Sequence, residues 1–359
     1  MQNSPAARQA VVVGAGFAGA VTARELADHG YQVKILERRA QIGGNMYDYP
    51  RDGVLTHLYG PHIFHTGNRK VFEYLSRFTR WVPYEHRVLG RIKGKYVPIP
   101  FNFRSMEELF PSEEAAMLRE KLTAAYPGQD RVSVLDLVHN PDPDIARLGE
   151  FVFENVFVHY TAKQWGMPVE QVDTSVINRV PVVLGYDDRY FRDPIQMMPE
   201  QGFTPLFEAM LDHENITVEL DTDARSRLTL TEDGKILLDG VAFTGPVIYT
   251  GAPDELLGCR LGALPYRSLR LDFETLETDS FQPASVVNYP NEEDFTRITG
   301  MEAYYPIDSE ESHALYQRYR EEFARYGNLY FCGRLAEYRY YNMDAAVDAA
   351  LRLSAELVK

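Results

Sequence analysis

Three glycines near the start of the chain have the spacing of a dinucleotide-binding turn. Gly14, Gly16 and Gly19 form the pattern GxGxxG, with Phe17 directly after the second glycine. The first glycine permits a tight turn, the second lets the backbone approach a pyrophosphate, and the third allows close helix–strand packing. Glu37 follows at the spacing expected of a carboxylate that accepts hydrogen bonds from ribose hydroxyls. These residues predict a site for a dinucleotide.

A second glycine pair bears on the choice between NAD and FAD. Glu37 is followed by Arg38 and then by Gly43, Gly44 and Asn45. This arrangement resembles that of the glutathione-reductase-like FAD proteins, in which the second turn lets the chain run along the extended cofactor. The pair therefore favours FAD, with Arg38, Gly44 and Asn45 as cofactor-binding candidates.

A further signal for FAD lies near the C-terminus. An apolar run at 328–332 ends at a glycine and Arg334, and a helical pattern follows. In FAD proteins such a closing segment often places a strand end and a helix N-terminus beside the flavin and the pyrophosphate. Arg334 is a candidate phosphate contact because a guanidinium binds phosphate through charge-assisted hydrogen bonds. Tyr340, Asn342 and Met343 complete the cofactor-binding candidates.

The elements that must position these groups open with a βαβ unit. Residues 10–13 read as a buried strand, 17–29 as a helix that ends at Gly30, and 31–36 as a second strand. Such a unit predicts a parallel sheet. Residues 216–220, 236–243 and 247–249 are expected to be strands that return to this domain, and 343–357 its last helix.

Between these segments the pattern changes. Residues 106–160 favour a helical insertion broken by prolines, whereas 88–98, 180–190 and 264–273 favour short strands of a separate, mainly antiparallel sheet. The predicted fold class is α/β, with a Rossmann-like FAD-binding domain assembled from non-contiguous segments. The predicted domains are the FAD-binding domain (1–80, 208–253 and 326–359), a helical domain (104–176) and a substrate-facing sheet domain (81–103, 177–207 and 254–325).

Composition and charge narrow the range of partners. The net charge of −15 disfavours nucleic acid, which requires a basic face. The sequence contains no apolar run long enough to span a bilayer, and residues 1–9 are too polar for a signal peptide. Cys259 and Cys332 lack the spacing of a disulfide framework or a zinc site. We therefore expect a cytoplasmic protein that inserts into no membrane and carries no metal.

Seven sequence blocks, in order along nearly the whole chain, resemble those of the UDP-galactopyranose mutases. They are 59–66 (YGPHIFHT), 160–165 (YTAKQW), 178–181 (NRVP), 188–191 (DRYF), 295–298 (FTRI), 304–306 (YYP) and 333–340 (GRLAEYRY). The resemblance implies an isomerase that interconverts the pyranose and furanose forms of UDP-galactose without net redox change. N5 of reduced FAD would attack the anomeric carbon while UDP leaves. It also implies galactofuranose biosynthesis for cell wall polysaccharide, and a homodimer.

The resemblance assigns roles to residues within the blocks and close to them. Arg179 and Arg297 would hold the diphosphate. The uridine and the sugar would be framed by aromatic residues, and tyrosine hydroxyls would meet the diphosphate oxygens; these residues are Phe157, Tyr160, Trp165, Tyr190, Tyr305 and Tyr340. His62 and Arg267 would lie near the flavin. Without the resemblance, such arginines also suit surface ion pairs, the aromatic residues suit core packing, and His62 suits loop packing.

The sequence departs from the family pattern in two places. Residues 299–303 join the FTRI and YYP blocks almost directly, where family members carry a longer stretch with a histidine, aromatic residues and an acidic residue. Asn342 stands where the family ending has an aspartate, so a charge is lost. Two alternatives therefore stay open. One is an amine-oxidase-like FAD oxidoreductase, and the other is a UDP-sugar-binding flavoprotein whose turnover is impaired by the shortened loop.

Overall fold

The computed structural model divides the chain into two compact units, each formed from separate segments. The first unit comprises residues 1–84, 193–271 and 299–359, and the second comprises residues 85–192 and 272–298. The structure describes residues 8–51, 53–158, 180–268, 274, 277–278, 281–291, 293, 295, 303–306 and 309–359, and for 267–268 and 303–306 it describes the backbone alone.

A five-stranded parallel sheet forms the centre of the first unit. Its strands are, in spatial order, β12 (Ile216–Glu219), β2 (Gln32–Leu36), β1 (Gln9–Val13), β16 (Val247–Tyr249) and β20 (Leu329–Phe331). The strands come from three distant parts of the chain, and each reads as a short apolar or β-branched run. The predicted α/β class with a Rossmann-like domain built from non-contiguous segments is confirmed.

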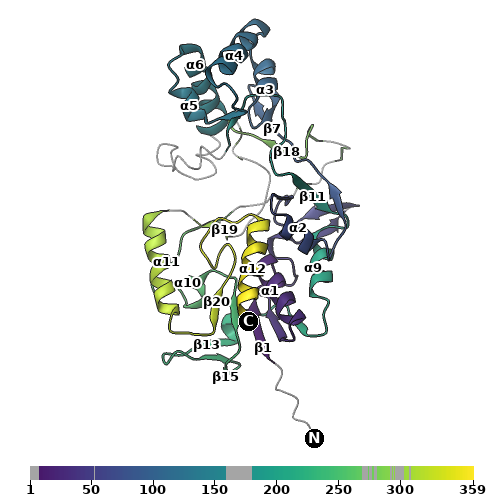
Figure 1. The fold of residues 1–359 in the computed structure, drawn as a ribbon, viewed down its shortest axis with the longest axis vertical. Helices are drawn as coiled ribbons and strands as arrows, with labels where there is room; N and C mark the ends of the chain where they lie inside the picture. The colour runs from purple at the N-terminus through teal and green to yellow at the C-terminus, as the bar shows by residue number, and fades with distance from the viewer. Residues whose placement is uncertain are drawn as a thin grey trace. The chain divides into compact units, whose positions relative to one another are not determined.

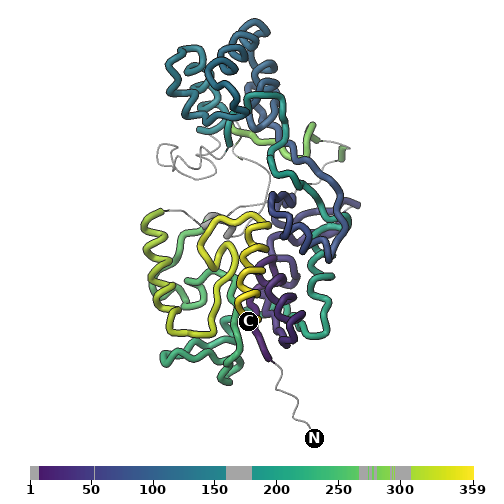
Figure 2. Tube along the Cα trace, in the orientation of Figure 1, coloured from purple at the N-terminus to yellow at the C-terminus, as the bar shows by residue number. Residues whose placement is uncertain are grey.

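The first and the last long helices of the chain pack side by side in this unit. α1 (Phe17–Asp28) and α12 (Met343–Leu357) are drawn in purple and yellow in Figure 1, and the trace in Figure 2 shows the same pairing of segments far apart in sequence. Small residues of α1, including Ala20 and Ala23, are fully buried in the core that the two helices share. α9 (Phe203–Leu211) contributes Phe203 and Phe207 to the same core.

Smaller sheets and helices complete the first unit. These are β3 (Asp48–Arg51) with β4 (Val54–His57); β5 (Phe64–Thr66), β11 (Ile195–Pro199) and β6 (Trp81–Pro83); β13 (Leu228–Leu230), β14 (Ile236–Leu238) and β15 (Val241–Phe243); β17 (Tyr266–Ser268) with β19 (Ala303–Pro306); and α2 (Arg69–Leu75), α10 (Pro253–Leu256) and α11 (Glu310–Phe323). Two short 3-10 helices, Gly44–Met46 and Ala224–Ser226, follow strand ends.

The second unit combines a helical cluster with a small sheet. Its elements are β7 (Val88–Ile92), β8 (Lys95–Ile99), β18 (Val286–Asn288), β9 (Arg131–Val132), β10 (Val182–Val183), α3 (Phe103–Leu109), α4 (Ser112–Ala125), α5 (Val134–Val138), α6 (Pro143–Val152) and a π-helix (Phe153–Val158). β7 pairs antiparallel with β8 and parallel with β18. Among the helices described in either unit, none combines the length and the apolar character required to cross a bilayer.

Several predicted segments differ from the observed elements. Residues 236–243 return to the first unit as predicted, but they form the hairpin β14–β15 rather than one strand, because Asp239 and Gly240 adopt positive φ and turn the chain. Of the predicted β segments, 180–190 retains only β10, and β17 in 264–273 belongs to the first unit. The finer division into three domains stays a prediction.

Candidate functional site

A pocket opens in the first unit where strands β1, β2 and β16 end. Ligands of open α/β sheets bind at this carboxyl edge. The pocket is lined by eleven of the residues predicted to contact a cofactor: Gly14, Gly16, Phe17, Glu37, Arg38, Gly44, Asn45, His62, Arg334, Asn342 and Met343. Residues from three stretches of sequence, near 13–62, 222–255 and 333–346, therefore meet at one site.

The glycine turn is packed so tightly that side chains are excluded. A Cβ on Gly14, whose φ is +99°, would lie 2.2 Å from Oγ1 of Thr250. A Cβ on Gly19 would lie 1.9 Å from the carbonyl oxygen of Gly14, which explains why the third glycine is needed for helix–strand packing. A Cβ on Gly44 would lie 3.0 Å from Cα of Gly16. The second turn thus rests on the first, and both expose backbone to the pocket.

Two helices begin at this pocket. Residues at the start of α1 and of α12 line it, and the N-cap residues are Gly16 and Asn342. Gly16 has no side chain with which to cap α1, and the side chain of Asn342 accepts no hydrogen bond from α12. The first backbone N–H groups of a helix lack partners within the helix and carry partial positive charge, so they attract anions. The site is therefore suited to a diphosphate.

Glu37 presents its carboxylate from the end of β2 in a fixed orientation. The residue is 5% exposed, and its Oε2 accepts a hydrogen bond of 2.7 Å from the backbone N–H of Ala15. Its Oε1 accepts a hydrogen bond of 2.9 Å from the N–H of Arg39. Each carboxylate oxygen has a second lone pair, so the group can still accept from a hydroxyl.

Arg39 lines the pocket, although the sequence prediction named only its neighbour Arg38. Its Nη2 donates to Oδ1 of Asn45 at 2.8 Å, and its guanidinium lies 4.3 Å from the ring centroid of Tyr59. Gln41 donates to the Tyr59 hydroxyl at 2.8 Å. This chain of contacts holds the second glycine turn and orients a cationic group at the pocket wall.

Charged residues from the segment after β12 form another part of the lining. Asp223 accepts hydrogen bonds from Arg225, and this bonding holds the pKa of the Asp223 carboxyl below its usual range. Arg38 lies 3.3 Å from Glu255, measured from Nη1 to Oε2. Both ion pairs are partly exposed, so we ascribe little stability to them.

His62 contributes a neutral imidazole. Its Nδ1 lies 2.8 Å from the carbonyl oxygen of Gly60, and since a carbonyl can only accept, Nδ1 carries the proton. Burial lowers the pKa of His62 to about 3, against the opposing effect of this hydrogen bond. The ring stacks on His57, with centroids 6.4 Å apart. At neutral pH, Nε2 is therefore the unprotonated nitrogen.

Hydrogen bonds made by the side chains of Arg334 and Glu337 join the two ends of the segment between β20 and α12. Nε of Arg334 donates to the carbonyl oxygen of Tyr341 at 2.9 Å. Glu337 accepts from the N–H of Gly333 at 2.8 Å and from the Tyr341 hydroxyl at 3.1 Å. These bonds join the start of the segment to its end and place Gly333, Arg334 and Tyr341 together in the pocket wall.

The remaining predicted residues lie elsewhere. Gly19 packs beneath the turn, and Tyr340 is 46% exposed beside Arg334, with the guanidinium 5.2 Å from its ring centroid. Arg267 pairs with Tyr305 across β17 and β19, where only the backbone is described. In the second unit, Phe157 is buried in the helical core and Tyr190 is half-buried. Tyr160, Trp165, Arg179 and Arg297 lie outside the described residues.

Some residues of the pocket were missed from the sequence. Thr250 and Gly251 follow β16, so the rule that ligands bind beyond strand ends identifies them once that strand is placed beside β1. Asp223, Arg225 and Glu255 carry no such signal, because their segments reach the pocket only through the tertiary fold.

A glycine-lined pocket at the carboxyl edge of a parallel sheet, with a buried carboxylate after the second strand, is typical of Rossmann-like dinucleotide-binding proteins. Residues 12–78 match the sequence model of the NAD(P)-binding Rossmann-like domain, which agrees with this class. Residues 155–302 and 299–340 match the model described as GLF, UDP-galactopyranose mutase. The chain belongs to the UDP-galactopyranose mutase family and is an enzyme of that family.

Individual relatives cover almost the full chain. It is 33% identical to a Klebsiella pneumoniae protein named "Probable UDP-galactopyranose mutase" over 97% of this chain and 94% of the relative. It is 31% identical to the dTDP-fucopyranose mutase of Escherichia coli over 97% of this chain and 98% of the relative. The solved structure of reduced UDP-galactopyranose mutase has a TM-score of 0.68, with 16% identity over 98% of this chain and 94% of that chain, which supports the fold.

The comparisons also bear on the short junction near residue 300. The two segments that match the family model meet at 299–302, where the sequence departs from the family pattern. The alignment with the Klebsiella protein spans 382 residues, whereas this chain has 359, so the relative carries residues that this chain lacks.

Proposed function

We propose that this enzyme interconverts UDP-galactopyranose and UDP-galactofuranose with reduced FAD and without net redox change. The observation that carries the proposal is the pocket in which the two glycine turns, Glu37 and the N-termini of α1 and α12 meet, in a chain whose near-full-length relatives are sugar-nucleotide mutases. Reduced FAD would supply at N5 the nucleophile toward the anomeric carbon.

The described residues fit FAD. The N–H groups at the starts of α1 and α12 would hold the pyrophosphate, and the Glu37 carboxylate would accept from the ribose. The close approach of Gly44 to Gly16 leaves a second backbone surface along which an extended cofactor can lie. Neutral His62 would present Nε2 as an acceptor near the flavin, and Arg334 would supply positive charge.

The substrate side rests on family residues. Arg179 and Arg297 would clamp the diphosphate, with Tyr190, Tyr305 and Tyr340 adding hydroxyl donors. Phe157, Tyr160 and Trp165 would frame the uridine and the sugar, while Arg267 would lie near the flavin. One relative is a dTDP-fucopyranose mutase, so dTDP-fucose is the alternative sugar nucleotide for this site.

Cellular context follows from the same proposal. Cys259 and Cys332 are both free thiols, which agrees with a reducing cytoplasm. Galactofuranose made there would serve cell wall polysaccharide, and a homodimer is the expected assembly.

A second candidate function is favoured by the meeting of the two family segments at 299–302. The protein would then bind FAD and UDP-sugar but turn over slowly or not at all, because residues that the family places in this stretch are missing. An amine-oxidase-like activity has no comparable support, since the proposed diphosphate clamp would not recognise a hydrophobic amine.

The test follows conversion and flavin state together. The purified protein is reduced with dithionite under anaerobic conditions and given UDP-galactofuranose or dTDP-fucofuranose, and products are separated by HPLC. Conversion of UDP-galactofuranose only when the flavin is reduced supports the mutase. UDP binding without conversion supports the second candidate, and flavin reduction by an added amine would overturn both.

A further inference from the structure

Asn102 occupies an unusually well-bonded position in the second unit. It is the N-cap residue of α3 and is 1% exposed. Its Oδ1 accepts from the backbone N–H of Ser105 at 3.0 Å, which forms one half of a capping box. Since that N–H can only donate, the orientation of the amide is fixed, and Nδ2 points away from the helix.

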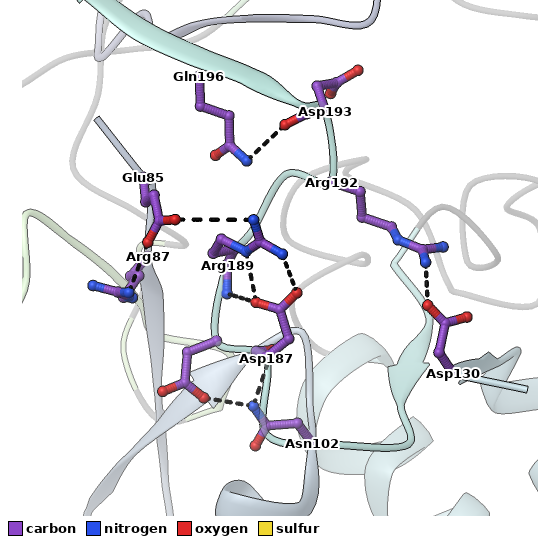
Figure 3. Close-up of polar contacts among 10 residues, drawn as sticks. Glu85, Arg87, Asn102, Asp130, Asp187, Arg189, Arg192, Asp193 and Gln196 are labelled. Carbon is purple, nitrogen blue, oxygen red and sulfur yellow. Dashed lines mark hydrogen bonds and ion pairs between the residues drawn. The ribbon is translucent and has the colours of Figure 1, made fainter. Parts of the chain in front are cut away.

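The amide nitrogen binds a different part of the chain. Nδ2 donates to Oδ1 of Asp188 at 2.8 Å. It also donates to the carbonyl oxygen of Asp187 at 3.4 Å, a contact drawn as a dashed line in Figure 3. The second oxygen of Asp188 lies 3.2 Å from Nε of Arg104, in the first turn of α3. The helix start thus holds the loop at 185–191 through Asn102 and Arg104, which flank Phe103.

Further contacts of the loop come both from within it and from neighbouring segments, among them the N–H of Phe103, which donates to the carbonyl oxygen of Gly185 at 3.0 Å. Arg189 binds Asp187 through Nε at 2.9 Å and Nη2 at 2.8 Å (Figure 3), and these bonds lower the pKa of the Asp187 carboxyl to about 2. The guanidinium of Arg189 is therefore engaged by its own loop and, at 3.9 Å, by the carboxylate of Glu85. Next to it, the N–H of Tyr190 donates to the carbonyl oxygen of His86 at 2.8 Å, and the two rings meet edge to face with centroids 5.7 Å apart.

Helix capping alone does not account for Asn102. Asp and Ser cap helix N-termini as well as Asn does. An ionised Asp has no proton to donate to the Asp188 carboxylate, and Ser would have to make both bonds through its single oxygen, whereas the amide accepts through Oδ1 and donates through Nδ2. The amide nitrogen Nδ2 of Asn102 therefore binds the loop, and Tyr190 is part of this loop.

We propose that Asn102 is a positioning residue that fixes the loop at 185–191 and so presents Tyr190 to the diphosphate of the sugar nucleotide. This inference rests on the proposed function, in which Tyr190 contacts that diphosphate. A loop that is ordered before the ligand arrives loses less conformational freedom on binding, so the anchor strengthens binding without touching the ligand.

The decisive variant is Asn102→Asp, which keeps the shape and the cap but places a carboxylate against Asp188. The double variant Asn102→Asp/Asp188→Asn exchanges donor and acceptor, and restores one hydrogen bond across the pair. Ser105→Ala is the matched control, because it weakens the capping box while leaving the bond from Asn102 to Asp188 in place.

Two readouts are taken on the flavin-loaded protein: hydrogen exchange of the amides at 185–191, and the Kd of UDP by calorimetry. We expect Asn102→Asp to speed exchange in the loop and to raise the Kd about tenfold. The double variant should bring the Kd back to within about threefold of wild type. Ser105→Ala should lower the melting temperature with little change in Kd.

The outcomes separate the two proposals. If wild-type protein does not bind UDP, the proposed function fails, and with it the role of Tyr190. If wild type binds UDP and Asn102→Asp leaves either the loop exchange or the Kd unchanged, the positioning role is overturned while the proposed function stands. Equal weakening of UDP binding by Ser105→Ala would reduce Asn102 to a helix cap and would also overturn it.

Discussion

Gly19→Ala tests whether the cofactor pocket depends on the close contact between α1 and the glycine turn. In the helix interior this substitution normally stabilises a protein, because alanine favours the helix over glycine by about 1 kcal/mol. Here the new Cβ would lie 1.9 Å from the carbonyl oxygen of Gly14, a backbone atom that cannot rotate away. The steric clash therefore predicts that Gly19→Ala lowers the free energy of unfolding, whereas helix propensity predicts that it raises it.

The magnitude follows from the displacement. Real Cβ atoms keep at least 3.0 Å from such neighbours, so α1 and the turn must separate by about 1.1 Å. Overpacking of this kind costs about 1–3 kcal/mol, which outweighs the gain in propensity. The same shift moves the first N–H groups of α1, and a misplacement of about 1 Å in groups that orient a ligand can cost on the order of 100-fold.

The assay combines flavin content after gel filtration with urea unfolding of the apo protein. Gly30→Ala is the control: its Cβ would meet no atom within 4 Å, but its φ of +83° imposes a backbone strain of about 1–2 kcal/mol. Both variants should be destabilised, and only Gly19→Ala should lose flavin. A Gly19→Ala protein with full flavin content and unchanged or raised stability would refute the reasoning.

Three further predictions concern the same unit. The pKa of an unfolded histidine is near 6.5, whereas burial lowers that of His62 to about 3, so the free energy of unfolding should fall as pH drops from about 6.5 toward 3. Urea titrations at pH 7 and 4.5 measure this fall, and His62→Gln should show a flatter dependence of stability on pH. Asp48→Ala removes the carboxylate that accepts two N–H groups at the start of α9, and should cost about 1–3 kcal/mol in thermal unfolding, with Asp48→Asn recovering part. Arg334→Lys loses the fork that holds the Tyr341 carbonyl and should release flavin faster on dialysis; retention equal to wild type would contradict the proposed role.

The parts of the fold that sequence predicts well are those with strong local signals. The strand before Gly14, the helix after it and the final helix at 343–357 each have a clear apolar period, and the structure places them as expected. The prediction of one strand at 236–243 was wrong. Asp239-Gly240 interrupts the apolar run, and both residues adopt positive φ, which is the turn that an Asp-Gly pair favours in a hairpin.

The candidate site divides in the same way. Glycines, Glu37 and Arg334 were predictable because each stands at a fixed offset from a strand or helix end. The side chains that contact and orient these residues were not predictable from the sequence. The contact of Tyr59 with Arg39, and the closure of Glu337 on Gly333 and Tyr341, depend on side-chain directions that no spacing rule specifies.

The short junction at 299–302 bears differently on cofactor binding and on catalytic turnover. The described residues that line the pocket come from stretches near 13–62, 222–255 and 333–346, and the junction itself lies outside the described residues. β19 begins just after it and still pairs with β17, with Arg267 opposite Tyr305. We therefore expect the described part of the pocket to bind the cofactor without the missing family residues, whereas turnover can depend on them. A yellow protein with full flavin content would agree equally with the mutase and with a binding protein, so only conversion of the furanose under reducing conditions distinguishes them.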